Sequence, residues 1–310
     1  MKLPSNDWSV RPPSFVITGA GGNIGSALTN YLRNKRYDVV ALRREDWDLT
    51  LGCSRVKGKV PNEASVVFHL AAQIGIQKSW TEPDEFFRVN VEGTRSVLEY
   101  CRRTNSGLVL MSTYMYSPSA QPPVNENALI EPLNPYAQTK LLAEELGRFY
   151  HQAFGIPVVI ARPFNVFGGV QTVEFLIPSI IRQAVGQSRQ ISVKDTDPVR
   201  DYIYIKDLVA ALERIGNGLV SGFLGSCEVF NVGTGIGTSV REVVETIQKV
   251  WRIDKPISSR NQPRKNEIPI SIADIRKIKK ELGWEPAYSL EEGLKDMFEA
   301  NPRFGTSVCN

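Results

Sequence analysis

Short apolar runs alternate with longer amphipathic stretches through the first half of the chain. An apolar run of about five residues between turn residues is typical of a strand buried on both faces, and strands that alternate with helices form a parallel sheet. The runs predict strands at Ser14–Thr18, Asp38–Leu42, Val66–Leu70, Leu108–Ser112 and Val158–Ala161. We therefore expect an α/β fold with a doubly wound, Rossmann-type parallel sheet.

The stretches between these runs repeat apolar residues with the period of helices. They predict helices at Ile24–Asn34, Glu82–Thr104 and Pro135–Phe154. The second carries apolar residues around much of its circumference, which is typical of a helix that packs against its own sheet or against a partner chain.

The rhythm changes after Gly168 to short helices and turn-rich segments, which indicates a second, smaller lobe. The expected organisation is a first domain over residues 14–168, to which the segment 200–232 returns, a C-terminal lobe over 169–302, and loose tails at 1–13 and 303–310.

The composition excludes several classes of protein. Of the 310 residues, 42% are hydrophobic and 23% are charged, as in an ordinary globular domain. No apolar run approaches the ~18 residues of a membrane span, and the first residues lack the apolar core of a signal peptide, so we expect a cytoplasmic protein without a membrane partner. A net charge of +4 without a basic run does not predict nucleic-acid binding. His69 and His151 are the only histidines and lie in no Cys/His cluster, so no metal site is expected.

A glycine-rich loop follows the first predicted strand and precedes the first predicted helix. Its spacing is Gly19-x-x-Gly22-x-x-Gly25. Glycines permit a tight turn and close approach of the backbone, and the helix N-terminus provides N–H donors for a pyrophosphate. The loop predicts a dinucleotide site that includes Gly19, Gly22, Asn23, Ile24 and Gly25, with a plain turn as the alternative.

The residues after the second predicted strand bear on which dinucleotide is bound. Enzymes that use NAD usually have Asp or Glu there for the ribose 2′-hydroxyl, whereas Arg43 and Arg44 stand here. A guanidinium matches a phosphate bidentately, so the pair favours the 2′-phosphate of NADP. NAD remains the alternative, if one of the two acidic residues directly after the arginines takes the ribose. Asp48 and Leu49 are candidates for contact with the adenine edge.

Hydride transfer at a carbinol carbon needs a group that moves the hydroxyl proton. A tyrosine can do this if a nearby cation lowers its pKa, and Tyr and Lys four residues apart share one face of a helix. The pattern occurs at Tyr31/Lys35, Tyr136/Lys140 and Tyr202/Lys206. We expect the first pair at the surface and the third in a strand, where the two side chains lie too far apart.

The second pair, Tyr136 and Lys140, has the context of an active site. It follows Asn134-Pro135, a typical helix start, and lies 23 residues after Thr113. Thr113 stands at the C-terminal edge of a predicted strand, where open α/β sheets bind ligands, and its hydroxyl can bond the substrate oxygen that Tyr136 protonates. Thr113, Tyr136 and Lys140 are therefore the predicted catalytic residues.

In their order along the chain, these motifs resemble the extended short-chain dehydrogenase/reductase family of sugar-nucleotide epimerases, dehydratases and reductases. The resemblance runs from Phe15 to about Phe298. The matching segments are Thr18–Gly25, His69–Ala72, Asn90–Thr94, Ser112-Thr113, Pro135–Lys140, Arg162–Gly168, Arg200–Ile205, Phe230–Gly233 and Leu282–Trp284.

The resemblance implies an NAD(P)-dependent enzyme whose substrate is a nucleotide-diphosphate sugar. The cofactor contacts that it implies, beyond the glycine loop and the arginines, are Leu70, Ala71, Ala72, Tyr136, Lys140 and Pro163. The substrate contacts that it implies are Thr113, Tyr136, Asn165, Arg200 and Arg264. It also implies a homodimer through the two long helices.

Departures from the family pattern narrow the expected reaction. The 4,6-dehydratases have Asp-Glu directly after the catalytic Thr, and GDP-fucose synthase has a Cys nearby, whereas Tyr114-Met115 stand here. Two reactions remain, and the favoured one is NADPH-dependent reduction of a nucleotide-linked 4-keto-6-deoxysugar at C4, with Tyr136 as general acid. The alternative is a C4 epimerase that keeps NAD bound, against which Arg43 and Arg44 count. A second alternative is a non-catalytic dinucleotide-binding sensor.

Overall fold

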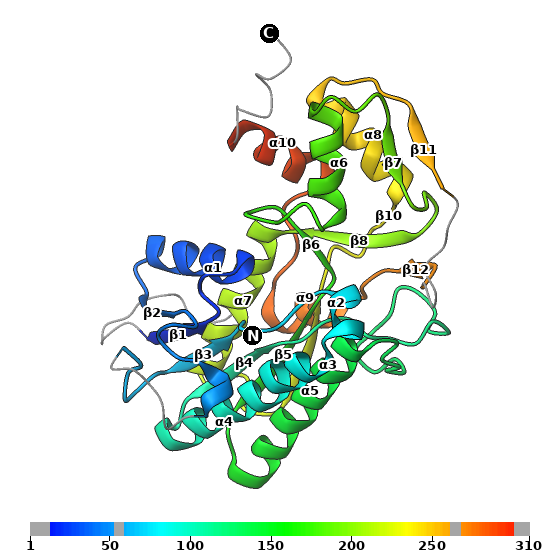
Figure 1. The fold of residues 1–310 in the computed structure, drawn as a ribbon. Helices are drawn as coiled ribbons and strands as arrows, with labels where there is room; N and C mark the ends of the chain where they lie inside the picture. The colour runs from blue at the N-terminus through cyan, green and yellow to red at the C-terminus, as the bar shows by residue number, and fades with distance from the viewer. Residues whose placement is uncertain (1–12, 53–58, 261–267, 301–310) are drawn as a thin grey trace.

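Six parallel strands form the main sheet of the protein, as the computed structural model shows (Figure 1). The structure describes residues 13–52, 59–260 and 268–300. The sheet has the order β2-β1-β3-β4-β5-β9, and its strands are β1 (Ser14–Thr18), β2 (Asp38–Leu42), β3 (Val66–His69), β4 (Gly107–Met111), β5 (Val158–Pro163) and β9 (Glu228–Val232). The predicted fold class is confirmed, and the five predicted strands lie within two residues of their observed ends.

Helices cover both faces of this sheet, because alternate strand residues point to opposite sides. Phe15, Ile17 and Phe68 share one core with α1 (Asn23–Asn34), α7 (Ile205–Val220) and α9 (Arg276–Leu282). Val16 and Val67 share another core with α4 (Gly93–Thr104) and α5 (Pro135–Phe154). In the described part of the chain, no helix is both long enough and apolar enough to cross a bilayer.

The predicted helix Glu82–Thr104 is wrong in its detail. The helical segment begins at Pro83, with α3 (Pro83–Phe86), and continues through a π-helical turn, η3 (Phe87–Glu92), into α4. A separate short helix, α2 (Ile76–Thr81), precedes it. Asn90 lies in the wide turn, and its side chain bonds the backbone N–H and carbonyl of Gln73 at 2.8 and 3.1 Å, so contacts distant in sequence accompany the change of helix type.

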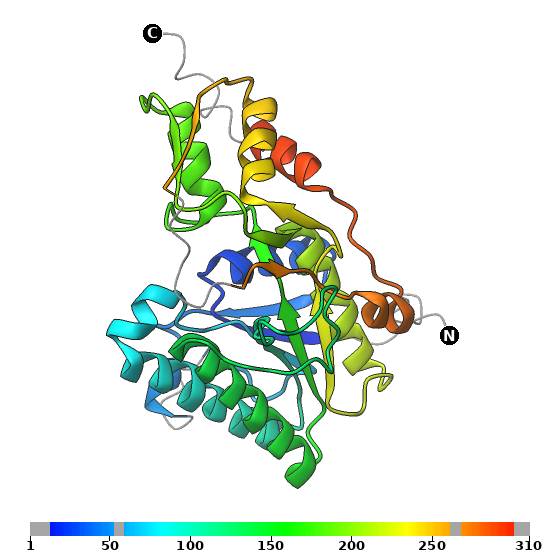
Figure 2. The same ribbon diagram turned by 90° about the vertical axis from the view of Figure 1, so that its right-hand side faces the viewer.

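The smaller lobe has its own sheets and its own core. In one sheet, β8 (Val199–Tyr204) pairs with β6 (Asn165–Phe167), β10 (Gly237–Ser239) and β12 (Ile270–Ser271), while β7 (Ile191–Val193) pairs with β11 (Ile257–Ser259). The helices α6 (Leu176–Val185), α8 (Val240–Trp251) and α10 (Leu290–Ala300) pack above them, at the top of both views (Figures 1 and 2). Within the segment 200–232, β8 thus lies in the small sheet, whereas α7 and β9 lie against or in the main sheet.

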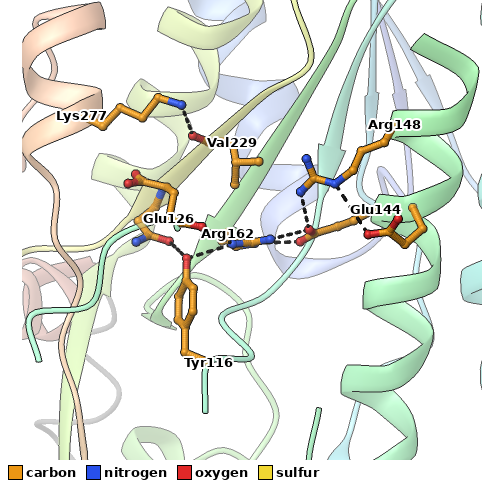
Figure 3. Close-up of polar contacts among 9 residues, drawn as sticks. Tyr116, Glu126, Glu144, Arg148, Arg162, Val229 and Lys277 are labelled. Carbon is orange, nitrogen blue, oxygen red and sulfur yellow. Dashed lines mark hydrogen bonds and ion pairs between the residues drawn. The ribbon is translucent and has the colours of Figure 1, made fainter. Parts of the chain in front are cut away.

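A buried ion pair joins helix α5 to strand β5 (Figure 3). Nε and Nη2 of Arg162 donate to the two carboxylate oxygens of Glu144 at 2.8 and 2.5 Å, and these side chains are 1% and 0% exposed. Nη1 of Arg162 also donates to the Tyr116 hydroxyl at 3.1 Å and to the Glu126 carbonyl oxygen at 3.2 Å. The Tyr116 hydroxyl in turn donates to Asn231 of β9 at 2.6 Å. One guanidinium therefore connects a helix, two strands and the segment after β4.

We expect Glu144→Gln to lower the free energy of unfolding by about 3–5 kcal/mol, because it leaves the Arg162 charge buried without its counter-ion. The neighbouring Glu145→Gln is the matched control, since the Glu145 side chain is 61% exposed; its effect should stay within about 0.5 kcal/mol. Urea unfolding of both variants measures the difference. Equal stabilities of the two variants would show that the buried pair is not needed for the fold.

Candidate active site

The order of the strands reverses direction at β1, which has β2 on one side and β3 on the other. In open α/β sheets ligands bind outside the carboxyl ends of the strands at such a point. The loops after β1 and β3 touch there, because a Cβ on Gly19 would lie 2.6 Å from the backbone nitrogen of Ala71. Gly19 also has a φ of 69°, so both space and conformation require glycine. Leu70 and Ala71 therefore lie beside the glycine loop, and Ala72 follows them in the chain.

Gly22 and Gly25 have different roles in this loop. A Cβ on Gly25 would overlap the carbonyl oxygen of Gly19, so Gly25 permits the close packing of α1 against the loop. Gly22 is the N-cap of α1, and among the described residues a Cβ there would meet only the carbonyl oxygen of Gly19, at 3.3 Å. The backbone at the start of α1 is therefore accessible on this side, as a pyrophosphate bound at a helix N-terminus requires.

Asn23 bonds through its side chain to the loop after β6. Its Nδ2 donates to the carbonyl oxygen of Gly168 at 3.0 Å, and its Oδ1 accepts from the N–H of Val170 at 2.5 Å. Ile24 packs against the core beneath α1. Because both side chains are engaged within the protein, Asn23 and Ile24 can contact a cofactor mainly through their backbone. The sequence did not indicate this engagement of the side chains.

Arg43 lies beside the glycine loop at the end of β2. A Cβ on Gly21 would be 3.8 Å from the Arg43 side chain, which is 65% exposed. Asp46 is buried, accepts from the N–H of Arg43 at 3.0 Å and pairs with Lys59 at 2.6 Å; the Lys59 ammonium holds the pKa of the Asp46 carboxyl below its usual value. Glu45 is exposed, 3.9 Å from Arg43. Arg43 thus places a positive charge next to the glycine loop, whereas the Asp46 carboxylate is already bonded to Lys59 and to the Arg43 backbone.

Arg44 forms an ion pair with Asp48, at 3.3 Å. Asp48 also accepts from the N–H and the hydroxyl of Thr50 at 3.1 and 2.7 Å, and so caps the short 3-10 helix η1 (Leu49–Leu51), in which Leu49 is buried. Asp48 and Leu49, the residues predicted to contact adenine, therefore lie next to Arg44. The Asp48 carboxylate is already hydrogen-bonded within the protein.

Tyr136 lies in the first turn of α5, next to the end of β4. Asn134 caps this helix by accepting from the N–H of Ala137 at 2.9 Å. The Thr113 side chain, which follows β4, lies near enough to the Tyr136 phenol to influence its pKa. Burial raises the pKa of Tyr136 to about 12, although the Thr113 side chain opposes this shift. The phenol is therefore protonated at neutral pH, as a general acid must be.

Lys140 lies one turn further along α5 and is 5% exposed. Burial lowers its pKa to about 8, while the Glu144 carboxylate one turn on opposes the shift. His69 is fully buried at the end of β3, and burial and then the Lys140 charge lower its pKa to about 3, so it is neutral. The ammonium of Lys140 is thus the charge that this part of the site can offer to a ribose hydroxyl or to the Tyr136 phenol.

A series of hydrogen bonds leads from the glycine loop to α5. Thr18 bonds His69 at 2.8 Å, and His69 bonds Thr94 at 3.1 Å. Thr94 donates to the Asn90 carbonyl at 2.6 Å, and Asn90 Nδ2 donates to the Thr139 hydroxyl at 3.0 Å. Asn90 and Thr94 occur in a segment that resembles the family, but the sequence did not reveal this role. These bonds hold the two halves of the site in fixed relation.

Ser112 is a further candidate site residue, although the sequence pattern singled out only Thr113. Its N–H continues the pairing of β4 with β5 by donating to the Ala161 carbonyl at 2.8 Å. Its hydroxyl is buried and has no hydrogen-bond partner among the described residues. A buried hydroxyl without a partner is costly, and this one lies at the ligand-binding edge of the sheet, so it suits a ligand oxygen. The adjacent Ser-Thr pair was the available signal.

Two of the predicted substrate residues, Asn165 and Arg200, lie on strands of the small sheet. Asn165 of β6 donates to the Asp201 carbonyl at 3.2 Å and accepts from the Tyr114 hydroxyl at 3.1 Å. Arg200 of β8 donates to the carbonyl oxygens of Val199 and Pro269 at 2.9 and 3.2 Å. Arg264 lies outside the described residues. Pro163, at the end of β5, is buried. Asn165 thus lies close to the end of β4, whereas Arg200 lies further along the lobe.

The other two Tyr–Lys pairs have structural roles. Tyr31 and Lys35 both bond the buried carboxylate of Glu213, at 2.8 and 2.6 Å, so they fasten α1 to α7 rather than forming a free surface pair. Tyr202 lies in β8, but Lys206 lies in the first turn of α7, so the expectation of one strand for both is wrong. In residues 13–52, 59–260 and 268–300, no group of three or more His, Cys, Asp or Glu side chains gathers as a metal site would need.

The sheet topology, the glycine loop and the Tyr-x-x-x-Lys helix define a short-chain dehydrogenase/reductase of the extended type. The chain matches the family described as GDP-mannose 4,6 dehydratase over residues 59–297, and it belongs to this family. The predicted resemblance is therefore confirmed.

The relatives of the chain include an epimerase and dinucleotide-bound structures. A UDP-glucose 4-epimerase of Bacillus subtilis is 30% identical over 91% of this chain and 95% of its own length. The structure of MoeE5 in complex with UDP-glucose and NAD has a TM-score of 0.81 and 29% identity, over 94% of this chain and 99% of its own. The structure of RMD from Pseudomonas aeruginosa with NADPH has a TM-score of 0.83 and 26% identity, over 96% and 100%.

We expect Gly22→Ala to weaken NADPH binding by about 10-fold or more while the fold persists, because the added methyl group occupies the approach of the pyrophosphate. Gly225→Ala is the control, since a Cβ there is at least 3.8 Å from any described atom. Fluorescence titration with NADPH and thermal unfolding measure the two effects. Wild-type affinity in Gly22→Ala would place the pyrophosphate elsewhere.

Proposed function

We propose that this protein catalyses the NADPH-dependent reduction of a nucleotide-linked 4-keto-6-deoxysugar at C4. The observation that carries the choice of cofactor is Arg43 beside the glycine loop, together with the engagement of Asp46 by Lys59. A guanidinium at this position favours a 2′-phosphate, and a carboxylate would favour a free 2′-hydroxyl. The NADPH held by RMD of Pseudomonas aeruginosa, which has a similar fold, supports this choice.

In this reaction bound NADPH supplies the hydride that adds to C4 of the keto sugar. Tyr136 donates its phenolic proton to the C4 oxygen, so the carbonyl becomes an alcohol. Its pKa of about 12 in the protein without ligands keeps that proton available. Lys140 holds the ribose and, as an ammonium, stabilises the phenolate that remains. Thr113 and Ser112 bond the C4 oxygen and orient it toward Tyr136.

The substrate carries two phosphates, which need cations. We assign Arg200 and Arg264 to the diphosphate and Asn165 to the sugar end next to it, since arginine forks match phosphate oxygens. We also propose that α4 and α5 form a homodimer interface. On α5, Phe149 and Phe154 are 56% and 51% exposed and pack edge-on, with ring centroids 6.2 Å apart, which suits an interface.

A C4 epimerase is the second candidate, favoured by the UDP-glucose 4-epimerase of Bacillus subtilis that this chain resembles. An epimerase removes hydride from C4 and returns it to the opposite face, so it consumes no NADPH. Retention of Thr113, Tyr136 and Lys140 counts against a non-catalytic sensor.

We expect stoichiometric loss of NADPH absorbance when one member of a panel of UDP-, GDP- and dTDP-linked 4-keto-6-deoxysugars is added. Tyr136→Phe should lower this rate by at least about 100-fold, because the general acid is lost, while NADPH binding is nearly unchanged. No loss of absorbance with any sugar, combined with interconversion of UDP-glucose and UDP-galactose, would replace the reductase by the epimerase.

We expect Arg43→Asp to weaken NADPH binding by about 10- to 100-fold and to leave NADH binding within about 3-fold, because only the 2′-phosphate loses its partner. Arg214→Asp, with the same change of charge at an exposed position of α7, is the control for long-range electrostatics. Titration with both cofactors measures the ratio. An unchanged ratio of NADPH to NADH affinity would refute the assignment of Arg43.

A further inference from the structure

Tyr114 lies directly after the predicted catalytic Thr113, at the carboxyl end of β4, and is held from two sides. Its ring stacks on Phe164, with centroids 4.8 Å apart and an interplanar angle of 12°. Its hydroxyl donates to Oδ1 of Asn165 at 3.1 Å. Asn165 is itself fixed, because its amide nitrogen donates to the Asp201 carbonyl at 3.2 Å. The phenol is therefore held in one position before any substrate binds.

This position lies between the two ends of the proposed substrate site. On one side are Thr113, the preceding residue, and the Tyr136 phenol, to which the Tyr114 phenol is near enough to add to the rise of its pKa. On the other side is Asn165, which we assign to the sugar end next to the diphosphate. A hexose that reaches from Asn165 to Tyr136 must pass along Tyr114.

The chemistry of the held phenol defines what it can offer. The Tyr114 hydroxyl donates its proton to Asn165, and a phenol oxygen that donates can also accept hydrogen bonds. It therefore suits a sugar hydroxyl, which donates. Half-buried between these partners, Tyr114 is a single phenol and not the acid–base pair that elimination of water would need.

We propose that Tyr114 is a specificity-determining residue that accepts a hydrogen bond from a ring hydroxyl of the hexose and holds one face of the sugar toward the hydride. The proposal rests on the proposed function and deepens it. Transfer to a single face gives a single configuration at C4, whereas epimerisation requires the sugar to turn over. A ring fixed by both Phe164 and Asn165 opposes that turn.

The first test compares binding of a nucleotide sugar with binding of its nucleotide, for the full chain saturated with NADP⁺. The probes are UDP-glucose and UDP, GDP-mannose and GDP, and dTDP-glucose and dTDP. Tyr114→Phe keeps the stacking and loses the hydroxyl. This variant should weaken the affinity for the nucleotide sugar by about 3- to 10-fold and leave the affinity for the nucleotide unchanged. Tyr31→Phe, which loses a hydroxyl bonded to Glu213 between α1 and α7, should change neither affinity.

Several results would overturn the proposal. Unchanged affinities in Tyr114→Phe would show that the hydroxyl does not contact the sugar. Equal weakening of sugar and nucleotide would show that Tyr114 acts only by holding Asn165. Failure of the wild-type chain to bind any nucleotide sugar more tightly than its nucleotide would leave no sugar contact for Tyr114 to make. None of these results depends on whether the enzyme is a reductase.

The second test addresses the fixed face of the sugar and uses turnover. With the 4-keto sugar that consumes NADPH, the wild-type chain should give one C4 configuration, and Tyr114→Ala should give a mixture, read by NMR of the product. A single configuration from a folded Tyr114→Ala variant would overturn the one-face part of the proposal. If no sugar consumes NADPH, the proposed reductase fails while the binding test of Tyr114 still stands.

Discussion

The buried ion pair of Arg162 and Glu144 is the interaction on which the geometry of the site depends. Glu144 lies one turn from Lys140 on α5 and accepts from Arg162. The Arg162 guanidinium also bonds Tyr116, which lies in the segment that begins at Thr113. Both charges are removed from water, so the pair adds little to the net free energy of folding. Removing either partner is nevertheless strongly destabilising, because it leaves the other charge buried without a counter-ion. The pair therefore fixes how α5 lies against β5, and with it the distance from the Tyr-x-x-x-Lys helix to the end of β4. The orientation of the proposed catalytic groups on α5 is therefore set by a contact outside the candidate site.

Two polar arrangements complete this support from opposite sides. The bonds from Thr18 through His69 to Thr139 join the glycine loop to α5. In the small lobe, the Asp201 carboxylate is wholly buried and accepts the N–H groups of Thr234, Gly235 and Ala273 at 2.8, 2.8 and 3.2 Å. Buried polar groups that are fully bonded specify one arrangement of the chain. The carboxyl end of β4 lies between these two hydrogen-bonded arrangements. The glycine loop of the main sheet is on one side of it, and Asn165 of the small sheet is on the other.

The sequence predicted the parts of the structure that depend on local patterns. Helix α5 was placed with its observed bounds, because Asn134-Pro135 starts it and Gly155 ends it with a φ of 72°. The π-helical turn at Phe87–Glu92, the clamp of Tyr31 and Lys35 on Glu213, and the side-chain bonds of Asn23 were not predictable, since their partners lie far away in the chain. The short strands β6, β10 and β12 have two or three residues, too few to show a period.

The low pKa of Lys140 couples the site to protons as well as to ligands. An unfolded chain carries this lysine with a pKa near 10.5, and the folded chain with one of about 8. Between these two values the unfolded chain binds more protons, so this residue makes folding more favourable as the pH rises through the window and less favourable as it falls. A ligand that favours the ammonium form raises that pKa again, and near pH 8 to 9 its binding takes up protons from solution. The affinity of the site for such a ligand consequently declines in alkaline solution, with Lys140 as the proton-linked group.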